Sequence, residues 1–371
     1  MNPIGVTPQV TEYLYRKATV KGIPLSGTFE LTPVCNMDCK MCYIRLSAKQ
    51  QQAIAPLQSG DKWLALAQRA KEQGLLYLLL TGGEPFLHPD IRKILEGLQP
   101  MGIMTVLNSN GTMIDENTVA WLKKCPPARI NISIYGADDE TYGRLCGNPR
   151  GFTQVSHAIE LLLAAGIGVK LNCSVTPENA HALPKIAEFA KAKGLYLQVA
   201  AYMFPPVRKD EKFVGQNARL TPEDAAYYTA YSEYLTLGKE RFLAKGCDTP
   251  TFPDMDEVCT DAGDGVRCRA GKCSFWVTWQ GDLLPCGMFS GENVPNVFEE
   301  NFNTAWQTVR RHVAEIRLPG KCAGCEAKDV CHACAAMVYT ESGNFREVPK
   351  YRCDMIHSYP TQWQRVKEEI L

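Results

Sequence analysis

The sequence predicts an α/β fold in which parallel strands alternate with helices. From about residue 27 to residue 203, short apolar runs alternate with stretches of helical periodicity, and each helical stretch closes near a glycine suited to a helix C-cap. Strands that alternate with helices form βαβ units and a parallel sheet. About six units are expected, fewer than a closed eightfold barrel needs. An open, partial barrel and a doubly wound sheet therefore both fit the pattern.

The expected elements follow one another in a regular order. The apolar runs that mark strands are GTFEL (27–31), LLYLLL (75–80), IMTVLN (103–108), RINISI (129–134), VKLNCSV (169–175) and LYLQVA (195–200). The stretches that mark helices include DKWLALAQRAKEQG (61–74), HPDIRKILEGLQPMG (88–102) and GFTQVSHAIELLLAAG (151–166). A further helix is expected at about 222–245, after a long polar loop around 205–220. In either architecture, functional residues belong at the C-terminal ends of the strands.

Length and composition exclude several classes of protein. The chain has 371 residues, 45% of them hydrophobic, and a formal net charge of zero, so it is long enough for two or three domains. No basic block provides a footprint for nucleic acid or an anionic membrane. The N-terminus lacks an apolar signal core, and no run of about 18 apolar residues is present. We expect a soluble, cytoplasmic protein.

Sixteen cysteines are many for a protein of a reducing compartment, where metal binding or thiol chemistry is more common than structural disulfides. Three stand near the start of the chain, and eight fall between Cys268 and Cys353. The remaining five are scattered and are interpreted as small buried hydrophobic residues: Cys125, Cys146, Cys173, Cys247 and Cys259. Apolar periodicity is weak from residue 259 to residue 353, so we expect metal binding to stabilise this region.

The first three cysteines, Cys35, Cys39 and Cys42, form a C-x3-C-x2-C pattern directly after the first expected strand. Three thiolates can hold three irons of a four-iron cluster and leave the fourth iron free for another ligand. The alternative is a zinc knuckle with a distant fourth ligand. TGGEP (81–85) follows the second expected strand, so it belongs at the same edge of the sheet as the cysteines.

These patterns resemble the radical S-adenosylmethionine (SAM) superfamily, whose signature is this cysteine spacing followed by an aromatic residue. The resemblance extends from about residue 27 to residue 203 and implies a partial (β/α)6 TIM-like barrel. It implies that the open iron chelates the amino and carboxylate groups of SAM. It also implies that an electron from this [4Fe-4S] cluster cleaves SAM to a 5′-deoxyadenosyl radical, which abstracts a substrate hydrogen.

The resemblance further implies which residues contact SAM. Gly82, Gly83 and Glu84 match the family's Gly-Gly-Glu motif, in which the glutamate accepts from the SAM ammonium. The other expected contacts are Ser133 and Arg144, for the ribose or carboxylate, Ser109 at the end of the third strand, and Tyr43 beside the adenine. The catalytic acid or base is not identified.

The C-terminal cysteines resemble the SPASM domain, which carries auxiliary clusters in peptide- and protein-modifying radical SAM enzymes. The resemblance implies two auxiliary [4Fe-4S] clusters, one held by Cys268, Cys273, Cys286 and Cys334 and the other by Cys322, Cys325, Cys331 and Cys353. The chain departs from the family at Cys331 to Cys334, where C-x2-C replaces C-x3-C, and this affects the partition of ligands. Structural zinc at Cys322, Cys325, Cys331 and Cys334 is the alternative. His332 is expected to pack against a cluster.

These interpretations divide the chain into an N-terminal extension (1–26), the radical SAM partial barrel (27–215), a linker with a helix (216–260), the SPASM domain (261–358) and a C-terminal tail (359–371). The first hypothesis for function is a radical SAM/SPASM oxidoreductase or maturase that acts on a peptide or protein. The runner-up is a small-molecule enzyme of the same architecture, for example an alcohol dehydrogenase. A non-catalytic iron–sulfur electron carrier or a zinc scaffold is the alternative from another class.

The expected partners follow from the first hypothesis. They are a peptide or protein substrate and an electron donor such as flavodoxin or ferredoxin, with no nucleic acid and no membrane. The roughly 25 residues before the first strand are too few for an independent domain. Recognition of a leader peptide is therefore expected from the polar loop and the cysteine-rich domain, or from a separate leader-binding protein.

Overall fold

The computed structural model describes residues 9–206, 218–247, 265–289, 293–327, 331 and 333–371. Most of the polar loop expected around 205–220 lies outside the described residues, as do Cys259 and His332. Within the described part, no helix is both long enough and apolar enough to cross a membrane.

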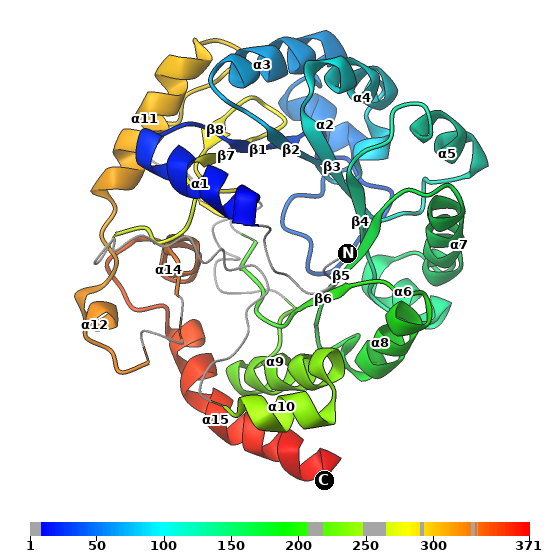
Figure 1. Ribbon diagram of the computed structural model, residues 1–371, viewed down its shortest axis with the longest axis vertical. Coiled ribbons are helices and arrows are strands. Elements are labelled where there is room, and N and C mark those ends of the chain that lie inside the picture. The colour runs from blue at the N-terminus through cyan, green and yellow to red at the C-terminus, as the bar shows by residue number, and fades with distance from the viewer. Residues whose placement is uncertain (1–8, 207–217, 248–264, 290–292, 328–330, 332) are drawn as a thin grey trace.

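The centre of the protein is one curved sheet of strands in the order β6-β5-β4-β3-β2-β1-β7-β8. The first six strands in the chain are all parallel, and β7 joins the sheet in parallel beside β1. The short strand β8 runs antiparallel to β7 and ends the sheet. Figure 1 shows α3, α4, α5, α7 and α8 on the outside of the curve. This arrangement confirms the partial barrel that the sequence predicts.

The strands are β1 (Ser26–Glu30), β2 (Tyr77–Thr81), β3 (Met104–Ser109), β4 (Arg129–Ser133), β5 (Val169–Ser174), β6 (Leu197–Ala200), β7 (Ser274–Val277) and β8 (Leu283–Leu284). The helices of the barrel are α1 (Gln9–Lys21), α2 (Ala48–Ile54), α3 (Gly60–Glu72), α4 (Ile91–Leu98), α5 (Glu116–Leu122), α6 (Asp139–Cys146), α7 (Gly151–Ala164) and α8 (Leu183–Ala192). The later helices are α9 (Pro222–Leu237), α10 (Lys239–Lys245), α11 (Phe302–Glu315), α12 (Gly320–Ala323), α14 (Ala335–Ser342) and α15 (Lys350–Ile370). Single 3₁₀ turns are η1 (Pro85–Leu87), η2 (Gln99–Met101) and η3 (Ala180–Ala182).

The two faces of the sheet differ in chemistry because successive side chains of a strand point to opposite faces. One face carries residues such as Leu80, Leu107 and Ile132, which are fully buried in the same core as Trp63 of α3. The other face carries polar residues in register on neighbouring strands, among them Asn108 and Asn131, whose amide groups hydrogen-bond at 2.7 Å. The barrel therefore has an apolar outer layer and a polar interior.

The cysteine-rich region is tied to the barrel by apolar packing, which the sequence pattern did not reveal. Phe275 of β7 packs against Phe29 of β1 and against Phe302 of α11, with ring centroids 6.5 and 5.3 Å apart. Trp306 is buried and donates from its indole nitrogen to the carbonyl of Gly22 at 2.8 Å. Part of this packing comes from α11, whose buried residues Phe302, Trp306 and Val309 recur at helical spacing, and part from the short strand β7.

Helical packing also joins the end of the chain to the residues that follow the barrel. The helix expected at about 222–245 is two helices, separated at Gly238, which has φ 77°. Helix α15 continues through Pro360 and across residue 358, where the sequence pattern placed a boundary. It packs along α9, where the hydroxyl of Tyr359 donates to Glu233 at 2.9 Å. The rings of Trp363 and Phe242 stack with centroids 5.1 Å apart.

Candidate active site and cluster-binding cysteines

The first three cysteines lie in the loop that follows β1, at the C-terminal edge of the parallel strands. All three side chains are half-buried. The backbone N–H of Met37 donates to Sγ of Cys35 at 3.4 Å, and that of Arg45 donates to Sγ of Cys42 at 3.3 Å. Burial, together with the negative charges of Glu84, Cys39 and Cys42, raises the pKa of Cys35 to about 12, although the N–H of Met37 opposes the rise. Three sulfurs close enough to oppose one another's ionisation, with amide donors directed at two of them, fit a cationic iron–sulfur cluster.

The last turn of α6 supports this loop from one side. The carbonyls of Cys146 and Leu145 accept from the backbone N–H groups of Asp38 at 2.9 Å and Lys40 at 3.0 Å. A hydrogen bond with the thiol of Cys146, together with burial, raises the pKa of Cys39. Cys146 is fully buried, as expected, but it also contacts a cysteine of the first cluster pattern, which sequence spacing did not indicate.

Gly82 and Gly83 bring the end of β2 against the backbone that leads into the cysteine loop. A Cβ atom on Gly82 would lie 2.4 Å from the carbonyl oxygen of Thr32, and one on Gly83 would lie 2.4 Å from that of Val34. The N–H of Gly83 donates to Thr32 at 2.7 Å, and the N–H of Glu84 donates to Val34 at 2.9 Å. In the structure, these glycines permit close approach of two backbone segments, and this contact places Glu84 beside the cysteines.

Glu84 is a completely buried carboxylate held by three donors. Ser109 donates from its hydroxyl to Oε1 at 2.9 Å, the N–H of Phe86 donates to the same oxygen at 3.2 Å, and the N–H of Asn110 donates to Oε2 at 2.8 Å. Burial raises the pKa of Glu84 to about 7 despite these bonds. A buried carboxylate with a pKa near neutrality is suited to accept a charge-assisted hydrogen bond from a cationic group. The structure gives the hydroxyl of Ser109 a protein partner, Glu84.

Asn110 connects this carboxylate to the cysteine loop, and the sequence interpretation missed it. Its side-chain amide donates to Sγ of Cys35 at 3.6 Å and to the side-chain oxygen of Asn36 at 2.9 Å. Its own oxygen accepts from the hydroxyl of Thr112 at 2.7 Å. The signal was the polar sequence NSNG at the end of the third apolar run, in which only the serine was singled out.

The remaining expected SAM contacts lie on neighbouring elements. Ser133 ends β4, and its carbonyl accepts from the hydroxyl of Tyr142 at 3.4 Å. Arg144, in the α6 turn that supports the cysteine loop, pairs with Glu140 of the same helix at 2.6 Å and is partly exposed. Tyr43 is half-buried directly after Cys42.

The eight C-terminal cysteines fall into groups. Cys322, Cys325, Cys331 and Cys353 line one cavity of about 50 Å³. Burial raises the pKa of Cys322, and the other three thiols of this group add to the rise. Sulfur is the donor that iron–sulfur clusters require, so four cysteines around one cavity fit such a group.

The other C-terminal cysteines lie nearer the barrel. Cys334 is half-buried, and burial, together with the negative charges of Cys268 and Cys286, raises its pKa to about 12. Cys273 is buried at the start of β7, where the hydroxyl of Thr19 in α1 donates to its Sγ at 3.1 Å. No three His, Cys, Asp or Glu side chains among the described residues gather around the position of a single metal ion.

A larger cavity of about 430 Å³ opens at the N-terminal ends of the barrel strands. Its walls are residues of the first halves of β1 to β4, such as Thr28 and Asn131, together with Trp276 of β7. Cys268 and Cys286 also line this cavity. Two of the C-terminal cysteines therefore lie at the N-terminal end of the strands, opposite to the edge that carries Cys35, Cys39 and Cys42.

Comparisons with known proteins agree with this geometry. Residues 29–190 match the model of the radical SAM superfamily. The chain is 27% identical to the AdoMet-dependent heme synthase of Methanosarcina barkeri, over 87% of this chain and 94% of that protein. It is 24% identical to the antilisterial bacteriocin subtilosin biosynthesis protein AlbA of Bacillus subtilis, over 82% and 68% of the two chains.

Among solved structures, Streptococcus suis SuiB bound to precursor peptide SuiA is similar with a TM-score of 0.64 and 20% identity. The similarity covers 93% of this chain and 81% of SuiB, and it shows the fold. The cysteine loop, the buried glutamate beside it, the partial barrel and the matched relatives lead to one conclusion. Residues 29–190 form a radical SAM domain, and the chain, which is similar to SPASM-type radical SAM enzymes, is an enzyme that uses S-adenosylmethionine and [4Fe-4S] clusters.

Proposed function

We propose that this enzyme abstracts a hydrogen atom from a peptide or protein substrate and so acts as a maturase. The bound SAM and its cluster supply the 5′-deoxyadenosyl radical for this chemistry. The observation that carries the radical chemistry of this proposal is the shared site at the C-terminal edge of the strands. There Asn110 connects a buried carboxylate, Glu84, to the sulfur of Cys35. The peptide substrate is proposed from the relatives.

The protein's own residues have distinct roles in this proposal. Cys35, Cys39 and Cys42 hold the SAM-binding cluster, and Glu84 accepts from the SAM ammonium. Ser109 and the backbone N–H of Asn110 hold the carboxylate in place. The two auxiliary clusters take the ligand sets given by the resemblance. The cavity formed by Cys322, Cys325, Cys331 and Cys353 supports one set, and the proximity of Cys334 to Cys268 and Cys286 supports the other.

The cavity at the N-terminal ends of β1 to β4 offers the substrate an entrance at the end of the barrel opposite to the cysteine loop. Its volume of about 430 Å³ is within the range of small-ligand sites, about 300–1,000 Å³, so it can receive one side chain of a peptide rather than a folded domain. Arg129 stands at its wall, with Nε donating to Asn131 at 2.8 Å. A substrate group held here would face Cys268 and Cys286.

Two relatives support a peptide substrate. The name of AlbA assigns it to the biosynthesis of a bacteriocin, and SuiB is solved with its precursor peptide. By this analogy we propose that the peptide is recognised by a separate leader-binding protein, or by the polar loop around 205–220 together with the cysteine-rich domain. We also propose flavodoxin or ferredoxin as the electron donor.

A second candidate is a small-molecule substrate, and one observation favours it. The heme synthase of M. barkeri matches nearly the whole of both chains. The guanidinium of Arg129 in the barrel cavity would suit a carboxylate of such a substrate. The same cofactor site serves both candidates, so the substrate has to be identified by experiment.

Deuterium transfer distinguishes the two candidates. The anaerobically reconstituted, reduced enzyme is incubated with SAM and either uniformly deuterated peptides or a deuterated heme precursor, and 5′-deoxyadenosine is analysed by mass spectrometry. Deuterium from a peptide supports the proposal. Deuterium from the heme precursor, with none from any peptide tested, replaces it with the second candidate. Cys39→Ala serves as the control, because it should abolish formation of 5′-deoxyadenosine with either substrate.

A further inference from the structure

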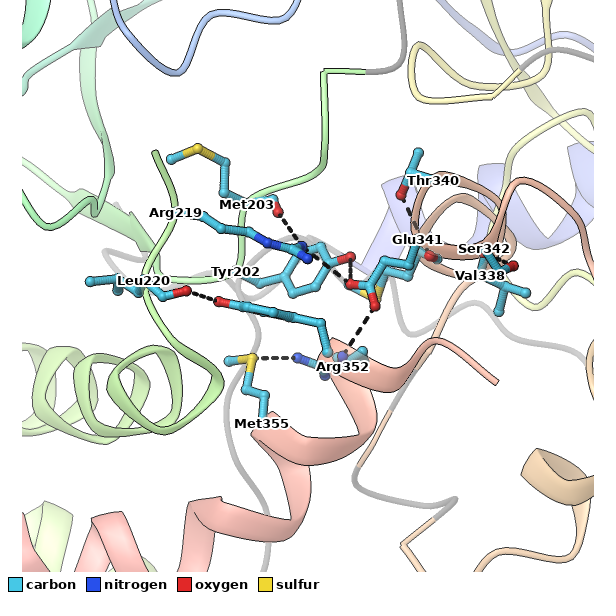
Figure 2. Close-up of polar contacts among 12 residues, drawn as sticks. Tyr202, Met203, Arg219, Leu220, Val338, Thr340, Glu341, Ser342, Arg352 and Met355 are labelled. Carbon is cyan, nitrogen blue, oxygen red and sulfur yellow. Dashed lines mark hydrogen bonds and ion pairs between the residues drawn. The ribbon is translucent and has the colours of Figure 1, made fainter. Parts of the chain in front are cut away.

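A buried carboxylate connects the end of the barrel to the C-terminal cysteines. Glu341 of α14 has only 4% of its side chain exposed. Figure 2 shows the groups that converge on it. The hydroxyl of Tyr202, just after β6, donates to Oε1 at 2.6 Å, and Arg219 lies 3.4 Å from the same oxygen. The backbone N–H of Arg352 donates to Oε2 at 3.4 Å.

Arg352 brings a buried positive charge to the cysteines. Its residue is 1% exposed, in the first turn of α15. Nε donates to the carbonyl of Cys331 at 3.1 Å, and a second guanidinium nitrogen donates to the same oxygen. Cys331 is one of the four cysteines around the 50 Å³ cavity, and Cys353, another of the four, follows Arg352 in the chain. The guanidinium is therefore fixed against the ligand loop of the proposed second auxiliary cluster.

Fixed buried charges act on a redox centre because reduction adds one negative charge to it. A nearby cation stabilises the reduced state and raises the reduction potential, whereas a nearby anion lowers it. Both effects are strong where water is excluded, since the protein interior screens charges less than solvent does. Arg352 lies against the ligand loop of this cluster site, and Glu341, which carries the opposite charge, accepts from the backbone N–H of Arg352 and pairs with Arg219.

We infer that Arg352 and Glu341 together set the reduction potential of the cluster held by Cys322, Cys325, Cys331 and Cys353, with Arg352 raising it and Glu341 lowering it. This inference rests on the proposed function, which supplies the cluster. A purely structural role for the two residues makes a different prediction. Loss of either side chain would then loosen the same ligand loop and shift the potential in the same direction.

Two substitutions that change charge but little shape separate these possibilities. The full chain is reconstituted anaerobically, and each cluster is titrated against potential by electron paramagnetic resonance, with iron and sulfide measured on the same samples. In Arg352→Gln, the ratio of reduced to oxidised cluster at fixed potential should fall about tenfold, a shift of about 59 mV to lower potential for one electron. In Glu341→Gln the potential should rise, and the double variant should lie between the two.

Matched controls are available in the same region. Lys350 lies on α15 two residues before Arg352, but its side chain is 85% exposed and paired with Asp354. Burial raises the pKa of the Cys353 thiol and Lys350 opposes this rise, but solvent screens the charge of Lys350, so Lys350→Gln should lower the potential by much less than Arg352→Gln does. Tyr202→Phe removes a hydrogen bond to Glu341 without changing charge and should also leave the potential near that of the wild type. The SAM-binding cluster serves as an internal reference within each sample.

The inference is overturned if both charge variants shift the potential in the same direction, or if neither shifts it while iron content is complete. If Arg352→Gln loses the four irons of this cluster, the inference is tested by the reduction potential of Glu341→Gln alone. A rise in its potential supports the inference, and a fall or no change refutes it. Failure of the proposed ligand set would look different, because the wild type itself would then lack the iron of this cluster or contain zinc in its place, whereas a small-molecule substrate would leave the cluster and its potential as they are.

Discussion

Replacement of Glu84 by glutamine tests the candidate SAM site most directly. The side chain keeps its shape, but the negative charge is lost. A hydrogen bond to a charged group is worth about 1.5–3 kcal/mol, so the dissociation constant for SAM should increase about 10- to 150-fold. The burial that raises the pKa of Glu84 to about 7 adds a second signature. Because the ionised form meets the SAM ammonium, wild-type affinity should rise from pH 6 to pH 8, and this rise should be absent in Glu84→Gln.

The three donors around Glu84 also predict a cost in stability. Glutamine offers one side-chain oxygen where the carboxylate offers two, so the amide group would face either the N–H of Asn110 or the donors at the other oxygen. A buried N–H without an acceptor costs about 1–3 kcal/mol of the free energy of unfolding. Ser109→Ala is the matched control. It removes one donor and keeps the charge, so SAM affinity should change less than about tenfold for a stability loss of about 1 kcal/mol.

The assay is equilibrium binding of SAM to anaerobically reconstituted protein, with iron and sulfide content measured in each variant. Affinity should be compared only between samples with full cluster content, because Asn110 also contacts Cys35. The assigned role of Glu84 would be refuted if Glu84→Gln, with all its clusters present, bound SAM as tightly as the wild type at pH 8.

Three further predictions concern the clusters, the backbone and pH. Replacement of Cys35, Cys39 and Cys42 by alanine should remove about four irons per chain and leave the auxiliary clusters in place. Iron, sulfide and zinc analysis that finds a single cluster and zinc in the wild type would contradict this prediction. Gly83→Ala should lower the free energy of unfolding by about 1–3 kcal/mol, because the added Cβ would lie 2.4 Å from the carbonyl oxygen of Val34. Gly320→Ala is the control and should leave the free energy of unfolding unchanged, because the space around Gly320 is open. Equal denaturation midpoints for the two variants would refute the close approach. Burial lowers the pKa of His88 below its ordinary value of 6.5, and its Nδ1 accepts from the N–H of Asp90. As the pH falls, the imidazole of His88 is therefore protonated in the unfolded chain before it is protonated in the folded one, so the free energy of unfolding should fall below pH 6.5. Thermal unfolding between pH 5 and pH 7 should show a shallower fall for His88→Asn than for the wild type.

The six barrel strands could be predicted from the sequence because each is a short apolar run bounded by turn residues and separated by a helix. The edge that carries the site followed from the same pattern, since parallel strands place their C-terminal ends together. The two added strands could not be predicted. β7 has four residues and β8 has two, which is too short for any periodicity to appear.

The helix at the C-terminus was missed for a different reason. Pro360 usually signals the end of a helix, but α15 passes through it, stabilised by tertiary packing of Tyr359 and Trp363 against α9 and α10. At the site, residue types could be predicted but their partners could not. Spacing identified Glu84, whereas only the fold shows that Ser109 and Asn110 hold it and that Cys146 lies against Cys39.

The parallel pairing of β1 with β7 has a consequence for synthesis of the chain. One edge of β1 is covered by β2 soon after both are made, but the other waits for residues 274–277, almost 250 positions later. At translation rates of about 5–20 residues per second, this edge stays open for roughly 12–50 seconds. An unpaired strand edge can pair with other chains during that interval. Release of a correctly assembled barrel is thus limited by the arrival of the cysteine-rich segment at the ribosome exit, and premature termination before residue 274 would leave a permanent template for aggregation.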